Sequence, residues 1–215
     1  MQLRQIVAHR RTPITEVFFV ESGIVSMIAE SPDDRIEIGV VGREGATTAG
    51  AAFGATQHPH TIMCQSPGDA LSIRRDDLEV LVGQSPSIAV ILGRYLHYLA
   101  VQIGQAAYAN ASMNIEARLA RWILMTDDRT DKFELNLTHE FLSVMLGARR
   151  PSVTSAIHVL EGAKMIRAER ATITITDRSK LEYIASDAYG LAETEYERLF
   201  GVNRSAEVKS SSEAR

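Results

Sequence analysis

The stretch at residues 137–166, LTHEFLSVMLGARRPSVTSAIHVLEGAKMI, constrains the fold of this chain more than any other. It predicts two short helices separated by a tight turn. Thr138 is a good N-cap for the first helix. That helix puts four apolar residues on one face, which are Phe141, Leu142, Met145 and Leu146. Gly147 ends it, because the turn needs the left-handed conformation that glycine adopts without strain.

The second helix of this pair is predicted to begin at Pro151, which suits the first helical position, and to run to about Glu161. Val153, Ile157 and Leu160 follow one another at spacings of four and three, so we expect them to face inward. The outward residues near its start are Arg150, Ser152, Thr154 and Ser155. Two short helices, a glycine turn and a second helix led by arginines and hydroxyls constitute a helix-turn-helix.

Two short strands are predicted directly after these helices, at residues 165–169 and 172–175, with Arg170 at the tip between them. Asp177 is placed to cap a further helix. A helix-turn-helix followed by such a wing is typical of a DNA-binding domain. The alternative is a small α/β domain whose arginines are merely solvated.

The first part of the chain has the pattern of antiparallel β-structure. Short, mostly apolar runs lie at residues 17–20, 24–28 and 70–73, apolar residues alternate with polar ones at 36–40, and turns rich in Gly, Pro and Asp punctuate this part of the chain. The pattern predicts a small antiparallel β-roll. With the helices that follow it, the chain has an α+β fold.

A long helix is predicted at about residues 87–110. Its apolar residues recur at spacings of three and four, interrupted by the polar Gln102, and are Ile88, Leu92, Tyr95, Leu99 and Ala106. They predict a coiled-coil-like dimer interface, and Gly93 and Gly104 would allow two helices to approach closely. Periodicity alone equally allows an ordinary core helix.

Charge and composition exclude several classes of protein. The chain has 215 residues and a net charge of −4, but residues 138–180 carry seven Lys and Arg against four Asp and Glu, so a basic segment of +3 lies in a body of −7. No apolar run is long enough to cross a membrane, and no secretory signal is visible. The single cysteine, Cys64, excludes an intrachain disulfide and multi-cysteine metal sites. We therefore expect a cytoplasmic protein.

These patterns divide the chain into four parts. They are a β-roll at residues 1–83, a dimerisation helix and the helix after it at 84–125, a winged helix-turn-helix at 126–190, and a frayed tail at 205–215. Within the second part, Asn114 is the expected cap of the second helix, and Leu119, Trp122 and Ile123 form its apolar stripe.

The order of these parts resembles the Crp/Fnr superfamily of bacterial transcription regulators, over roughly residues 14–185. The most specific segments are VFFVESGIVS and GVVGREG in the roll, IEARLARWIL, and LTHEFLSVMLGARRPSVT in the helix-turn-helix. The resemblance implies a cyclic-nucleotide-binding-like roll, here short at its N-terminus. It also implies a homodimer, joined through the long helix, that binds palindromic promoter DNA and contacts RNA polymerase. It implies a regulator rather than an enzyme.

Carried over position by position, the resemblance assigns roles to single residues. Arg150 matches the family's guanine-reading arginine, and Ser155 stands where several members place a second base-reading arginine. Pro151 replaces the family's base-reading glutamate. Three further residues match positions that hold phosphates, which are Thr138, Arg149 and Ser152. The preferred DNA sequence can therefore differ from that of other members.

The sensor part departs from the cyclic-nucleotide-binding members. The corresponding stretch at residues 47–66, TTAGAAFGATQHPHTIMCQS, contains neither the glutamate nor the arginine of their phosphate-binding segment. A cyclic phosphate needs such a charge or a helix end. We therefore expect no cyclic nucleotide and no cofactor, and the effector stays open.

His58 and His60 leave two alternatives for the roll. With a carboxylate they could hold a metal, as in cupin-like enzymes, but the expected glutamate is missing. Either histidine, or Cys64, could instead be an axial ligand in a haem-sensing regulator. The simplest interpretation puts both histidines in a surface loop and Cys64 in the core.

Overall fold

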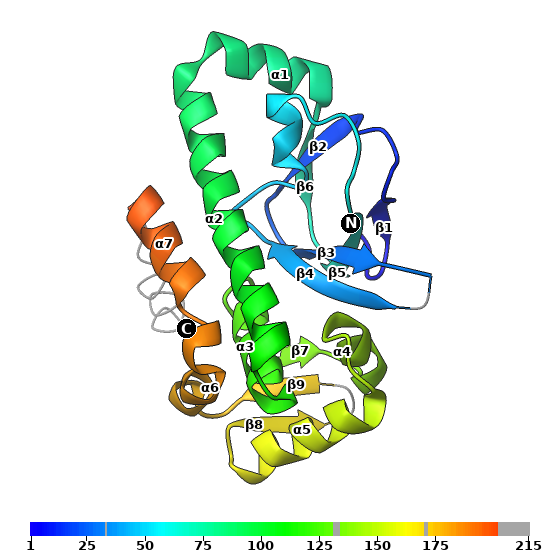
Figure 1. Cartoon of the computed structure of the whole chain (residues 1–215), viewed down its shortest axis with the longest axis vertical. Helices are drawn as coiled ribbons and strands as arrows, with labels where there is room; N and C mark the ends of the chain where they lie inside the picture. Colours follow the sequence, from blue (N-terminus) through cyan, green and yellow to red (C-terminus); the bar gives the residue numbers. More distant parts are fainter. Residues whose placement is uncertain (33, 131–133, 170–171, 202–215) are drawn as a thin grey trace. The chain divides into compact units, whose positions relative to one another are not determined.

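The computed structural model describes residues 1–32, 34–130, 134–169 and 172–201. The chain forms two compact units, Met1–Ala100 and the part from Val101 onward, and the boundary falls inside one long helix (Figure 1). Two predicted features, Arg170 and the tail at residues 205–215, lie outside the described residues.

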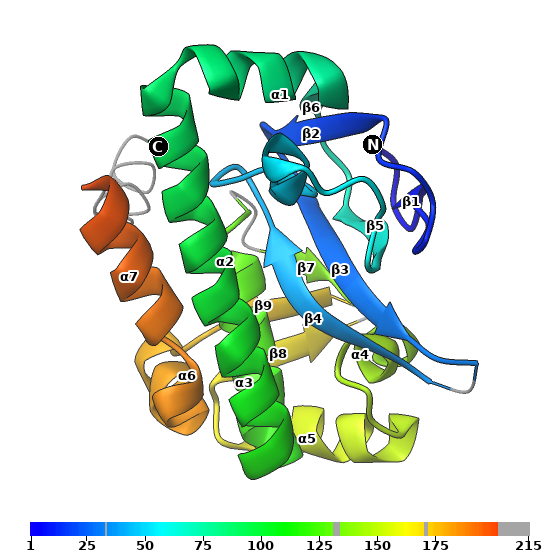
Figure 2. The same ribbon diagram turned by 45° about the horizontal axis from the view of Figure 1, so that its top comes forward.

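A four-stranded antiparallel sheet forms the centre of the first unit, with strand order β1-β5-β3-β4 (Figure 2). Its strands are β1 (Ile6–Ala8), β3 (Ile24–Glu30), β4 (Arg35–Val41) and β5 (Thr61–Ser66). A separate antiparallel pair joins β2 (Glu16–Val20) to β6 (Ala70–Arg74). The predicted antiparallel β-roll is confirmed. The three-residue β1 was not predicted, because so short a segment shows no alternation.

Facing residues of neighbouring strands form part of the core of the first unit. Val25 of β3 lies opposite Val41 on β4 and opposite Cys64 on β5, and all three side chains are buried. The prediction that Cys64 is a small core residue is confirmed. Gly23 makes the turn into β3 with a φ of 79°, and a Cβ there would lie 2.5 Å from the Ser66 carbonyl oxygen. This turn therefore requires glycine.

Three helical segments complete the first unit or continue from it. They are the 3₁₀ turn η1 (Ala49–Phe53), α1 (Arg75–Gln84) and the 27-residue α2 (Pro86–Ser112). The predicted long helix is confirmed within two residues at each end. Tyr95 of α2 packs directly against the backbone of Gly45, where a Cβ would overlap the tyrosine ring. No helix within the described ranges is long and apolar enough to cross a membrane.

The core of the second unit is built on α3 (Ile115–Asp127), which packs against α5 (Arg150–Gly162) and α6 (Arg178–Ala185). The Oδ1 of Asn114 accepts a hydrogen bond from the Ala117 amide at 2.9 Å, which confirms the predicted cap. Leu119 and Ile123 are fully buried, and Trp122 is nearly so. The apolar stripe predicted for this helix therefore faces the core.

The remaining elements of the second unit form a winged helix-turn-helix. A three-stranded antiparallel sheet has the order β7 (Glu134–Asn136), β9 (Thr172–Ile175), β8 (Ile166–Glu169). The helix α4 (His139–Met145) precedes α5, and η2 (Ser186–Ala188) and α7 (Leu191–Phe200) follow α6. The predicted helix pair and wing strands are confirmed, whereas β7 and α7 were not predicted.

Candidate nucleic-acid interface

The first helix of the pair, α4, is fixed by its cap and its apolar face. The Thr138 hydroxyl oxygen accepts a hydrogen bond from the Phe141 amide at 3.1 Å, so the predicted N-cap is confirmed. Phe141, Leu142 and Met145 are buried, and the Phe141 ring meets the Trp122 ring edge-on with centroids 6.1 Å apart. The Thr138 cap thus occupies the start of a helix anchored on α3.

The turn between α4 and α5 is closed by backbone hydrogen bonds. Gly147 has a φ of 53°, and the Ala148 amide donates to the Ser143 carbonyl at 3.0 Å. Arg118 of α3 donates through its guanidinium to the Leu146 carbonyl at the end of α4. Burial lowers the pKa of Arg118. The left-handed turn is therefore held from the α3 side as well as from within.

The second helix, α5, begins one residue earlier than predicted, at Arg150, so that Pro151 is the second helical residue. The amides of Ser152 and Val153 both donate to the Arg149 carbonyl, at 2.9 and 3.2 Å. Proline is accepted at the second position as well as the first, because backbone amides in the first turn of a helix do not need an acceptor within the helix. The sequence signal therefore identified the turn but not the residue at which the helix starts.

The two faces of α5 differ sharply. Val153, Ala156, Ile157 and Leu160 are buried behind it. Four of the predicted DNA-contacting residues are exposed on the other side, which are Arg149, Arg150, Ser152 and Ser155. No acidic residue lies among the first eleven residues of α5. The exposed start of this helix is therefore positively charged and rich in hydrogen-bond donors.

Among the residues of α5 predicted to contact DNA, Thr154 instead contacts another helix of the same chain. It is half-buried, and its hydroxyl lies 2.9 Å from Nδ1 of His139 on α4. The hydroxyl therefore links the two helices. The sequence could not reveal this pairing, because it depends on how the helices cross.

A polar network fixes α6 at the end of α3. The Arg178 guanidinium lies 2.6 Å from a carboxylate oxygen of Asp127 and 2.6 Å from one of Asp128, and it donates to the Tyr189 hydroxyl at 2.7 Å. Burial lowers the pKa of Arg178, but the charges of Asp128, Tyr189 and Asp127 outweigh it and leave the pKa above its ordinary value. The charged arginine thus links α6 to the end of α3 and to Tyr189, which follows η2.

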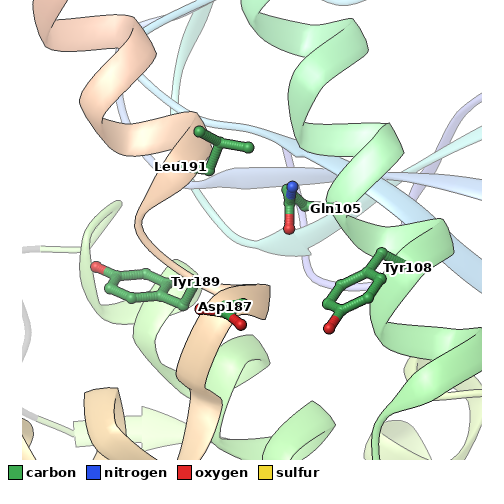
Figure 3. Close-up of a pocket in the computed structure, with 5 residues that line it drawn as sticks. All are labelled: Gln105, Tyr108, Asp187, Tyr189 and Leu191. Carbon is green, nitrogen blue, oxygen red and sulfur yellow. The ribbon is translucent and has the colours of Figure 1, made fainter.

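Arg121 of α3 makes a second internal connection. It donates to the Ala188 carbonyl of η2 at 2.9 Å and to the Gln102 carbonyl of α2 at 3.3 Å. Nearby, Gln105 and Tyr108 of α2 line an open cavity of about 510 Å³ with Asp187, Tyr189 and Leu191 (Figure 3). Its lining is mixed, and no cluster of basic groups marks it as an anion site.

Comparisons with known proteins agree with this architecture. The profile of the cyclic nucleotide-binding domain matches residues 2–85, and that of the Crp-like helix-turn-helix domain matches residues 117–184. The chain has the domains and fold of the Crp/Fnr superfamily. No curated protein matches it.

Several solved structures share the fold at low sequence identity. FixK2 from Bradyrhizobium japonicum is 15% identical with a TM-score of 0.75, over 87% of this chain and 96% of that one. TTHA1359, a CRP/FNR-family transcriptional regulator from Thermus thermophilus, is 17% identical with a TM-score of 0.73, over 88% and 98%. TTHB099, a CRP-family regulator from the same organism, is 16% identical with a TM-score of 0.71, over 86% and 95%.

The residues predicted for the dimer interface lie on the inward face of α2. Within the first unit, Leu92, Tyr95 and Leu99 are only 5%, 4% and 8% exposed. Within the second unit, Ala106 is 6% exposed. Ile88, near the start of α2, is half-buried. Side chains already buried in their own chain have little surface left to bury against a second copy.

The two histidines His58 and His60 of the roll do not share one environment. The prediction of a surface loop is wrong for His58, which is 7% exposed and whose amide donates to the Thr12 carbonyl at 3.0 Å. His60 is half-buried. Burial lowers the pKa of both rings and raises the pKa of the Cys64 thiol. Among the described residues, no three His, Cys, Asp or Glu side chains gather as metal ligands do.

Proposed function

We propose that this chain is a homodimeric transcription regulator that binds promoter DNA sequence-specifically through α5. The observation that carries the proposal is the exposed, acid-free start of α5, where Arg149 and Arg150 project beside Ser152 and Ser155 while the opposite face is buried. An arginine donates two hydrogen bonds to O6 and N7 of guanine in the major groove, and hydroxyls and helix ends suit phosphates.

Arg150 is the proposed base reader, and Thr138, Arg149 and Ser152 are the proposed phosphate contacts. The Thr138 hydroxyl oxygen already accepts from Phe141, so its proton is the group left for a phosphate. Ser155 remains a proposed groove contact, whereas Thr154 reaches DNA only if its contact with His139 gives way. Arg170, which lies outside the described residues, stays a proposal from the sequence alone.

The proposed dimer forms through α2, on the face opposite the inward residues. In the first unit this face carries the exposed Val90, Gly93 and Ala100, and in the second unit it carries Gly104 and Ala107. A Cβ at Gly93 or Gly104 would meet no atom within 4 Å. Small residues at helical spacing allow two helices to approach closely. We therefore propose that this face of α2, instead of the residues predicted from the sequence, forms the dimer interface.

The proposed signal is not a cyclic nucleotide, although the roll matches the domain named for that ligand. Residues 47–66 contain no Lys or Arg to offset a cyclic phosphate. We propose that the dimer acts in the cytoplasm, where it binds its promoter and contacts RNA polymerase.

Selection of bound sites from random double-stranded DNA, with the purified wild-type protein, tests the proposal. We expect enrichment of a palindrome whose half-sites are about 10–11 base pairs apart, centre to centre, or a multiple of that spacing. Equal recovery of all sequences would contradict sequence-specific binding, and enrichment of a single unrepeated half-site would contradict the dimer.

A further inference from the structure

The outward face of α5 has a central line of four exposed residues at spacings of four, three and four, which are Pro151, Ser155, His158 and Gly162. It lies opposite the buried line through Val153, Ile157 and Leu160. In a helix laid into the major groove, the residues of such a central line come nearest to the base edges.

Three of these four residues are too small or too apolar to read a base at a distance. A Cβ at Gly162 would meet no atom within 4 Å, so that end of the line is open. Small side chains along the line allow the helix backbone to approach the groove floor closely. His158 is then the one long polar side chain on the line, and it is 69% exposed.

The carboxylate of Glu161 lies on one side of the His158 ring. Nδ1 of His158 lies 3.9 Å from Oε2 of Glu161, one turn further along α5. The other carboxylate oxygen of Glu161 accepts a hydrogen bond from the Ala168 amide of β8 at 3.0 Å. Glu161 is therefore held by the wing with its carboxylate on the Nδ1 side of the ring, and the Nε2 edge is the one proposed to meet a ligand.

We propose that His158 is a second base-reading residue of this protein and that it selects guanine. The Nε2–H of the ring can donate a hydrogen bond to N7 or O6 of guanine. His158 follows Arg150 by eight residues, or about 12 Å along the helix. At ~3.4 Å per base pair, the two guanines lie three to four base pairs apart in each half-site.

This inference rests on the proposed function, and one set of selections tests both. Random-DNA selection is run on the wild type, His158→Ala, His158→Gln, and the matched control Val159→Ala, whose side chain is 54% exposed on the flank of the same helix. We expect the wild type to specify both guanines. His158→Ala should lose preference only at the second, with about a 5- to 30-fold loss of affinity per half-site.

The two other variants decide whether the contact is specific. His158→Gln should change the preferred base at the second position to adenine, because glutamine pairs with N6 and N7 of adenine. Val159→Ala should leave the profile unchanged, and thermal melting should match the wild type for all three variants. A wild-type profile that survives His158→Ala intact would overturn this inference alone. A wild type that selects no sequence would overturn the proposed function and this inference with it.

Discussion

Arg150 is the residue on which sequence specificity should depend most. It is exposed at the first position of α5, and nothing acidic lies near it on that helix. Arg150→Ala should cost about 1–3 kcal/mol on the selected site and relax the preference for one guanine per half-site. Fluorescence anisotropy with the selected site and its single-base variants measures both effects.

Arg149→Ala is the natural comparison for that variant. If Arg149 contacts only phosphate, its loss should weaken specific and non-specific DNA equally and make the salt dependence of binding less steep. Identical sequence profiles for the wild type and Arg150→Ala would show that the base reader has been assigned to the wrong residue.

Thr138 separates a structural role from a DNA contact. Its hydroxyl oxygen caps α4 through the Phe141 amide. Thr138→Ala should therefore lower the free energy of unfolding by about 1 kcal/mol, as the loss of an N-cap does. Thr138→Ser keeps the hydroxyl and should restore both stability and DNA affinity. Urea unfolding measures the stability, and an unchanged unfolding curve for Thr138→Ala would contradict the role of Thr138 as an N-cap.

The caps were predictable from the sequence, and the contact between Thr154 and His139 was not. Thr138, Asn114 and Asp177 each cap an amide a few residues further along the same chain, so local sequence determines them. Thr154 instead meets a residue of another helix. Pairings of this kind depend on helix packing, which a short sequence window does not contain.

At the scale of elements, the face of α2 that is free for a partner should respond to a single charge. Gly104→Glu places two like charges against each other in the proposed dimer, which should dissociate it. The fold should survive, because a Cβ at Gly104 meets no atom within 4 Å and glutamate favours helix over glycine by roughly 0.5–1 kcal/mol. Sedimentation at micromolar concentration measures the mass.

Gly83→Glu is the matched control for that variant. Gly83 lies in α1, outside the proposed dimer interface, and a Cβ there would also meet no atom within 4 Å. It should leave the mass unchanged. A Gly104→Glu protein that remains a dimer would contradict the proposed close contact between the two copies of α2.

The long helix also shows what periodicity can and cannot predict. The repeat through Leu92, Tyr95 and Leu99 correctly marked one face of α2 as apolar. It could not say what covers that face, because a neighbouring element of the same chain and a second chain require the same pattern. In the structure these three side chains are buried within the first unit. The contact between Gly45 and Tyr95 joins distant parts of the sequence, so the local pattern could not predict it.

At the scale of the whole molecule, the order of parts was predictable and the sheet order was not. Apolar runs, alternation and turn residues predicted four of the six strands of the roll, and capping residues and Gly147 predicted the helix-turn-helix. The order β1-β5-β3-β4 brings β5 between two strands far from it in sequence. Such pairings are set by long-range packing rather than by local pattern.

The lack of Lys and Arg at residues 47–66 of the roll leads to a prediction about the whole regulator. Cyclic AMP and cyclic GMP carry a fixed negative charge, and burying such a charge without a partner costs several kcal/mol. His58 and His60 are the only residues at 47–66 whose side chains can carry a positive charge, and burial lowers the pKa of both, which favours their neutral forms at pH 7. We therefore expect titration calorimetry to detect no cyclic-nucleotide binding below millimolar concentration, and DNA binding to need no added nucleotide. Arg43 is the nearest basic residue in sequence before this segment and is exposed. Micromolar affinity for cyclic AMP that Arg43→Ala abolishes would identify Arg43 as the missing partner and make this a nucleotide-gated regulator.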